Sequence, residues 1–144
     1  MRRHFLSLLL SIVFLLSCQV SEQEKIYQTL NRRQEALEKR ELSLYLSCIS
    51  KAYQDKEGDF DRLEKRIGGY FKTFDRITYS SSDRSVHIEG ETATVVQQFH
   101  LEVEKGEKKN RLEVGKEEKK YRYSGKEALF LKKEGREWRI IKGL

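Results

Sequence analysis

Residues 90–104 read GETATVVQQFHLEVE, and this stretch decides the fold. From residue 93 to residue 103, every second residue is apolar except Gln97. The set is Ala93, Val95, Gln97, Phe99, Leu101 and Val103. A period of two over this length is typical of a β-strand with one face on a core and one face toward water. Gly90 at its start predicts a tight turn from a preceding strand.

The segments on either side of this strand alternate in the same way. Before the turn, Ile77 and Tyr79 begin a strand, residues 80–85 interrupt it, and Val86 and Ile88 resume it. After a charged stretch, a third strand runs through Tyr121, Tyr123, Leu129 and Leu131, with Gly125 as the expected site of a bulge. A turn at residues 134–136 leads to a last strand over residues 137–142, which contains Trp138 and Ile140. We therefore expect an antiparallel meander.

The N-terminal half has a helical period instead. Ile26, Leu30 and Leu37 indicate an amphipathic helix, and a new stripe after Glu41 indicates a bend or a second helix. Residues 55–59 predict a loop, and Asp59 or its neighbour could cap a further helix. The residues that this helix is expected to bury are Leu63, Ile67, Tyr70, Phe71 and Phe74. Helices followed by a meander make an α+β domain, with the helices packed on one face of the antiparallel sheet.

This order of elements resembles the nuclear transport factor two-like superfamily, which includes polyketide cyclase-like and ketosteroid isomerase-like proteins. The resemblance covers residues 25–144, which we expect to form a single domain. Its pieces are the opening helix, LSLYLSCISKAY (residues 42–53) with the acidic loop after it, GETATVVQQFHL (residues 90–101) and GREWRIIKGL (residues 135–144). The resemblance implies a strongly curved, cone-like sheet around a pocket closed by the helices. Members include enzymes, small-molecule binders and structural domains, so the resemblance does not fix a function.

The first 18 residues, MRRHFLSLLLSIVFLLSC, have the pattern of a bacterial lipoprotein leader. A charged start precedes a short apolar run, which is too short for a spanning helix of roughly 20 residues. The run ends Leu15-Leu16-Ser17-Cys18, which resembles a lipobox cleaved before a lipidated Cys18. We expect residues 1–17 to be a signal peptide and residues 18–24 a tether. The alternative is an ordinary secretory leader, or an uncleaved anchor, in which Cys18 is incidental.

This leader predicts a protein that is lipid-anchored in the bacterial cell envelope. Gln19 is not Asp, and in a cell with two membranes the resemblance therefore implies the outer membrane, with the domain facing the periplasm. The formal charge is +6, and removing Arg2 and Arg3 from the 29 basic residues leaves 27 against 23 acidic ones, or +4. So small an excess in an exported chain does not predict a nucleic-acid partner.

The basic excess falls within residues 105–122, KGEKKNRLEVGKEEKKYR, which contain eight basic and four acidic residues. A hairpin there could contact anionic envelope surfaces. It could equally be a solvated hairpin whose charges discourage edge pairing.

The residue types of common catalytic and metal centres are sparse. Cys48 lies among apolar residues, so we expect a buried, inert thiol. His87 and His100 fall on the polar sides of their strands, and no spacing predicts a metal site. We therefore expect no catalytic residues, no metal and no cofactor.

Gln97 and Glu127 are the candidates for a site. Gln97 keeps phase with Val95 and Phe99, and Glu127 keeps phase with Leu129 and Leu131. Polar groups on an inner face need hydrogen-bond partners, and they could line a pocket and hold a ligand. Alternatively, a bulge at Gly125 could turn Glu127 outward, or the sheet end could be open to water. The candidate pocket comprises Tyr53, Tyr70, Gln97, Phe99, Tyr123 and Glu127.

These features favour an envelope lipoprotein with a non-catalytic binding or scaffolding domain. Its partner would be an apolar small molecule or an envelope protein, in addition to the membrane reached through Cys18. One alternative is a periplasmic enzyme of the isomerase or dehydratase type. A second alternative is a structural module that contacts anionic surfaces through the basic hairpin at residues 105–122.

Overall fold

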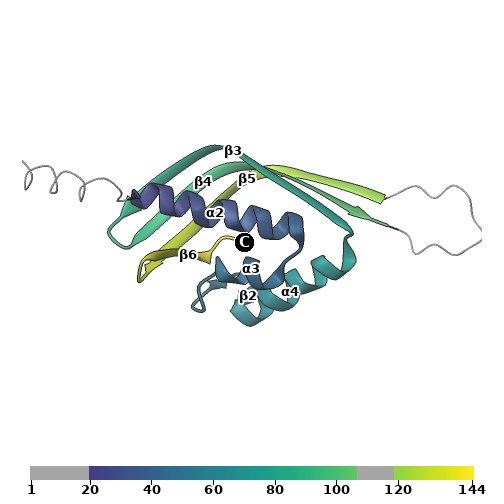
Figure 1. The fold of residues 1–144 in the computed structure, drawn as a ribbon, viewed down its shortest axis with the longest axis horizontal. Coiled ribbons are helices and arrows are strands. Elements are labelled where there is room, and N and C mark those ends of the chain that lie inside the picture. The colour runs from purple at the N-terminus through teal and green to yellow at the C-terminus, as the bar shows by residue number, and fades with distance from the viewer. Residues whose placement is uncertain (1–19, 107–118) are drawn as a thin grey trace, which may run out of the picture.

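The computed structural model describes residues 20–106 and 119–144. Its helices are α2 (Glu22–Lys39), α3 (Leu42–Ser47) and α4 (Phe60–Thr73), and its strands are β1 (Gln54–Asp55), β2 (Gly58–Asp59), β3 (Arg76–Glu89), β4 (Thr92–Lys105), β5 (Lys119–Glu134) and β6 (Glu137–Lys142). The predicted α+β class is confirmed, because the helices come first and pack on a curved antiparallel sheet (Figure 1). The leader and Cys18 lie outside the described residues, as does most of the 105–122 hairpin.

Helix α2 begins earlier than its apolar stripe suggests. The Ser21 hydroxyl accepts a hydrogen bond from the backbone N–H of Glu24 at 3.1 Å, as an N-cap residue does. The helix ends at Arg40, which has the left-handed conformation (φ 56°). Residues 21–24, which the sequence assigns to the tether, form the cap and first turn of this helix.

The sheet has the order β3-β4-β5-β6, with each strand antiparallel to its neighbour. The interruption predicted at residues 80–85 is a bulge within one long strand, because the β3–β4 register shifts between Ser82 and Ser85. Asp83 within it has a φ of 50°. A bulge bends a strand and increases its twist, which suits a sheet that must curve around helices.

The bulge predicted at Gly125 is wrong. The register between β4 and β5 runs without a shift, and it pairs Phe99 with Gly125. A Cβ on Gly125 would lie 3.2 Å from Cε1 of Phe99, so the glycine makes room for the aromatic ring of the neighbouring strand. A residue without a side chain in a strand marks such close approaches as well as bulges.

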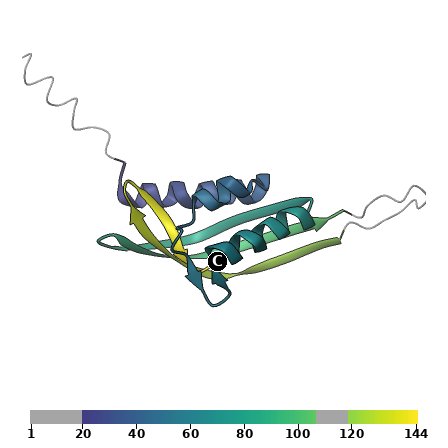
Figure 2. The same ribbon diagram turned by 90° about the horizontal axis from the view of Figure 1, so that it is seen from below.

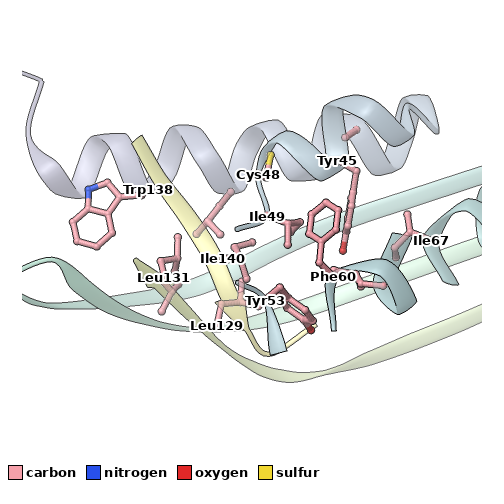
Figure 3. Packing of buried hydrophobic residues seen from close by; sticks show 14 of the residues in the cluster. Tyr45, Cys48, Ile49, Tyr53, Phe60, Ile67, Leu129, Leu131, Trp138 and Ile140 are labelled. Carbon is pink, nitrogen blue, oxygen red and sulfur yellow. The ribbon is translucent and has the colours of Figure 1, made fainter. Parts of the chain in front are cut away.

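The core lies between the helices and the inner face of the sheet, which is the face toward the helices (Figures 1 and 2). The largest fully buried apolar side chains include Trp138, Tyr45, Ile26, Ile49, Leu63, Leu129, Leu131 and Ile140. Figure 3 shows several of them beneath α2, from α3, β5 and β6, together with Phe60 and Ile67 of α4. Helix α4 begins at the predicted cap, since the Asp59 carboxylate accepts from the Arg62 N–H at 3.1 Å.

The first and last elements are joined by polar contacts. Nε1 of Trp138 donates to the Glu22 carboxylate at 2.7 Å, and the Thr29 hydroxyl donates to the Trp138 carbonyl at 2.9 Å. Nζ of Lys133 lies 3.0 Å from the same Glu22 carboxylate. These contacts fix the start of α2 to the β5–β6 hairpin.

Candidate functional site

Gln97 and Glu127 lie side by side on the inner face, as their phase in the sequence predicts. They are register partners on β4 and β5, and Nε2 of Gln97 donates to Oε1 of Glu127 at 2.6 Å. Gln97 is 1% exposed and Glu127 is partly buried. Glu127 therefore does not turn outward, because the bulge that would have turned it is absent from its strand.

Arg33 reaches this pair from α2. Its two terminal nitrogens lie 3.2 and 3.4 Å from the two Glu127 carboxylate oxygens, in a two-pronged ion pair. The Arg33 side chain is 8% exposed and that of Glu127 is 13% exposed, so the pair is shielded from bulk water. Two parallel charge-assisted hydrogen bonds fix the geometry of both groups.

Tyr79 completes the connection to β3. Its hydroxyl donates to the Glu127 carboxylate and accepts from Nε2 of Gln97 at 3.0 Å. The Arg33 guanidinium carbon lies 5.1 Å from the centre of the Tyr79 ring, within the range of a cation–π contact. Tyr79 also has an apolar neighbour, because the Phe99 ring is stacked near it, with ring centroids 6.4 Å apart.

A second arginine comes from the bulge in β3. Nε of Arg84 donates to Oε1 of Gln97 at 2.8 Å, and its terminal nitrogen donates to the Ser81 hydroxyl at 2.8 Å. Its guanidinium carbon lies 5.1 Å from the centre of the Tyr27 ring on α2. We call Arg33, Tyr79, Arg84, Gln97 and Glu127 the inner cluster.

The charges of the inner cluster are fixed near neutral pH. Burial raises the pKa of Glu127, but the Arg33 charge and the hydrogen bonds from Tyr79 and Gln97 outweigh it and hold that pKa below its usual value. Burial is also the main reason why the pKa of Tyr79 rises to about 12. Glu127 is therefore an anion paired with a cation, and Tyr79 is a neutral donor.

The polar groups of the inner cluster form hydrogen bonds mainly with one another. The Glu127 carboxylate accepts from Arg33, Tyr79 and Gln97, and the Gln97 amide binds Arg84 as well. One buried polar atom of the cluster, Nε of Arg33, has no hydrogen-bond partner among the described residues. A general acid or base needs a pKa near the working pH and access to substrate. The pKa shifts of Glu127 and Tyr79 move both groups away from that condition.

The other residues of the predicted pocket are dispersed. Phe99 lies beside the cluster and is partly buried, whereas Tyr53 is buried elsewhere and donates to the Asp55 carboxylate at 2.6 Å. Tyr70 and Tyr123 are 49% and 53% exposed, so they do not form a pocket wall. Tyr70 falls beside the buried stripe of α4. Tyr123 keeps the predicted phase but lies in the first part of β5, where the strand runs past the core (Figure 1).

An open groove of about 830 Å³ lies elsewhere, between α3 and α4. It is bounded by Arg40 and Leu42 on one side and by Gly68, Gly69 and Phe71 on the other. None of the inner cluster lines it. Its rim also carries Asp61, Glu64, Lys65 and Lys72, so both signs of charge surround a small apolar floor.

The remaining candidates behave as ordinary side chains. His87 and His100 are exposed, and their ring nitrogens lie 3.0 Å from Glu89 and 2.7 Å from Ser124. Cys48 is fully buried, and burial raises the pKa of its thiol. Across residues 20–106 and 119–144, no three potential ligands come together as a metal site would require. In the same residues, no helix combines the length and the apolar character needed to cross a membrane.

Comparison with known proteins gives the fold. No family model matches the sequence, and no curated protein matches it. Among solved structures, a nuclear transport factor 2-like superfamily protein from Salmonella enterica is 16% identical with a TM-score of 0.67, covering 83% of this chain and 86% of its own. A protein of the same family from Streptomyces avermitilis, provisionally called a dehydratase, is 12% identical with a TM-score of 0.70, covering 85% and 93%.

A third similar structure comes from Novosphingobium aromaticivorans. It carries a provisional scytalone dehydratase name, is 12% identical with a TM-score of 0.70, and covers 85% of this chain and 80% of its own. The TM-scores of 0.67 to 0.70 establish a shared nuclear transport factor two-like fold, whereas identities of 12% to 16% leave the function open.

Proposed function

We propose that this chain is an envelope lipoprotein whose nuclear transport factor two-like domain serves a non-catalytic scaffolding or protein-binding role. The observation that carries the proposal is the inner cluster. In the middle of the inner face, where such a fold could hold a ligand, Arg33 and Glu127 neutralise each other and Gln97 donates a further hydrogen bond to Glu127. The domain would then act through its outer surfaces.

The enzyme alternative has one observation in its favour. Two of the similar solved structures carry dehydratase names, and this chain has a tyrosine and a glutamate in contact on its inner face. Acid–base catalysis on that pair would need Glu127 to accept and release protons near neutral pH. The pairing of Glu127 with Arg33 lowers its pKa and opposes that role. The non-catalytic function is therefore the better supported of the two.

Attachment to the envelope rests on the leader and on Cys18. Cells expressing the full precursor would be fed a fatty acid with an alkyne tag, and the purified protein would be tested for the tag. We expect labelling and membrane retention in the wild type and neither in Cys18→Ala, because a lipoprotein cysteine carries more than one acyl chain and so anchors stably. Labelling that survives the substitution would refute the lipid anchor.

Binding of small molecules at the inner cluster can be tested by thermal shift. A panel of apolar small molecules should leave the melting temperature of the wild type unchanged, because ligands stabilise a fold only by binding it. The matched variants are Gln97→Leu and Glu127→Leu, made singly and together. A compound that stabilises the wild type but not the double variant would place a ligand site in the inner cluster and refute the scaffold proposal. Turnover abolished by Glu127→Gln would favour the enzyme instead.

A further inference from the structure

We propose that lipid on Cys18 holds one particular end of the domain against the bilayer and points the opposite, basic end of the sheet away from it. This inference rests on the lipidation proposed above and adds an orientation to it. The proximal end comprises residues 20–25 with the β3–β4 turn at residues 89–91 and the β5–β6 turn at residues 134–136. The distal end is where β4 ends, at Lys105, and where β5 begins, at Lys119.

The start of α2 is part of the rigid domain. Ser21 caps the helix, and the Glu22 carboxylate is held by Trp138 and Lys133 from the β5–β6 hairpin. Trp138 is 1% exposed, so this contact leads directly into the core. The chain therefore becomes part of the folded body from Ser21 onward.

The chain between the lipid and this body is very short. Three Cα–Cα steps separate Cys18 from Ser21, and at 3.8 Å each they span at most about 11 Å. This linker is short compared with the domain, so the first turn of α2 must stay close to the lipid headgroups of the membrane. Val20 is exposed, so its side chain is available to the interface.

Both proximal turns lie at the same end of the molecule as Ser21. The backbone N–H of Lys133 donates to the carbonyl of Glu91 at 2.8 Å, and the Lys133 side chain contacts Glu22. The β3–β4 turn, the β5–β6 hairpin and the start of α2 are therefore neighbours. Figures 1 and 2 both show this grouping at one end of the long axis.

The distal end is far from this group. Strand β4 has 14 residues from Thr92 to Lys105, and at about 3.3 Å per residue it extends roughly 45 Å. At its far end Arg40, just past α2, donates to the carbonyl of Phe74, and the N–H of Asp75 donates to the carbonyl of Glu104. Helix α2 thus runs along the sheet from the proximal end toward the distal end.

The distribution of charged residues over the domain favours a competing orientation, in which the domain lies flat on the membrane. The proximal turns carry Glu89, Glu91, Glu134 and Arg136, which offer no net attraction to anionic lipid. The distal strands carry Lys105, Lys119, Lys120 and Arg122, and Glu102 and Glu104 form ion pairs with Lys120 and Arg122 there. An anionic surface would attract the remaining positive charge most in a domain that lies flat. Screening over about 8 Å at physiological salt makes that attraction negligible for an upright domain, whose basic end is several times farther away.

The test measures the depth of fluorescent labels on the lipidated protein in phosphatidylethanolamine–phosphatidylglycerol vesicles. Single cysteines would be placed at exposed positions, with Glu91→Cys and Arg136→Cys for the proximal end and Lys105→Cys for the distal end. Cys48 is fully buried and Cys18 is blocked by lipid, so neither should take the label. The quencher would be a spin label on lipid headgroups, which acts on labels at the membrane surface.

We expect strong quenching of both proximal labels and none of the distal label. A ten-residue Gly/Ser insertion between Val20 and Ser21 should weaken the proximal quenching, because it frees the domain from the surface while the lipid remains. Equal quenching of all three labels would show a flat domain and overturn the orientation. A protein that stays off the vesicles and lacks lipid would instead overturn the lipidation on which the inference rests.

Discussion

The Arg33–Glu127 pair offers the sharpest test of what the inner cluster does for the fold. Glu127→Leu removes the counter-charge of a guanidinium whose side chain is 8% exposed and which cannot lose its proton. Removing one partner of a buried pair costs about 3–5 kcal/mol, since the remaining charge is left uncompensated. We expect a loss in that range in the free energy of unfolding, measured by urea denaturation of residues 20–144.

Arg33→Met should cost less than Glu127→Leu. The Glu127 carboxylate would keep its hydrogen bonds from Tyr79 and Gln97, and it can take up a proton when its cation is gone. The double variant Arg33→Met/Glu127→Leu removes both charges, and replacement of a buried pair by apolar residues is often close to neutral. We therefore expect the double variant to be more stable than Glu127→Leu alone.

A control pair lies on the surface of the same helix. Glu35 and Lys39 also form an ion pair, but their side chains are 52% and 55% exposed. Glu35→Leu should have little effect on the same urea curves, because exposed pairs contribute little to stability. A Glu127→Leu variant as stable as the wild type, or a cycle in which the two single effects simply add, would refute a role for the buried pair.

Three further predictions use the same unfolding measurements. In the first, Trp138→Ala should lower the free energy of unfolding by about 3–5 kcal/mol, because a buried aromatic side chain is removed. Trp138→Phe should lose less, and a wild-type curve for Trp138→Ala would contradict its burial. In the second, Gly125→Ala should destabilise by about 1 kcal/mol because its Cβ would meet the Phe99 ring, and Phe99→Leu should remove this penalty; equal losses in both backgrounds would exclude the contact. In the third, residues 20–144 should unfold in one transition by far-ultraviolet circular dichroism and by Trp138 fluorescence, and separate midpoints would exclude a single cooperative domain.

The stability should also depend on pH through Glu127. Its pKa in the folded state lies below the ordinary value of 4.5, so its contribution is complete above that value and is lost as the pH falls through the folded pKa. Wild type and Glu127→Gln should therefore differ most near neutral pH and converge in acid. A difference that does not change between neutral pH and strong acid would exclude this linkage.

The phase of polar residues predicts more of the inner cluster than residue type does. Gln97 and Glu127 are each out of place on an apolar face, and the meander makes them neighbours, so their contact follows from the sequence. Arg33 was missed although it continues the stripe of Ile26 and Leu30 on α2. A basic residue on a buried stripe is a signal that some carboxylate lies opposite it.

Arg84 and Tyr70 could not be placed by periodicity. Arg84 turns inward because the bulge between Ser82 and Ser85 changes the phase of β3, and a run of serines does not specify where the extra residue falls. Tyr70 neighbours the buried Phe71 on α4, and helix rotation of a few tens of degrees decides which ring is buried. Such rotations depend on packing with other elements, which the local pattern does not contain.

The contact between α2 and Trp138 also sets the order in which the domain can assemble. Each strand of the meander pairs with the next one along the chain, so the sheet closes through short loops and one longer connection. The Glu22 carboxylate, in contrast, contacts the indole of Trp138, 116 positions later in the sequence. Contacts that span most of a chain form slowly, because the entropy of closing the loop is lost first. Because α2 precedes Trp138 along the chain, the apolar stripe of this helix stays without this partner until the β5–β6 hairpin has docked on it.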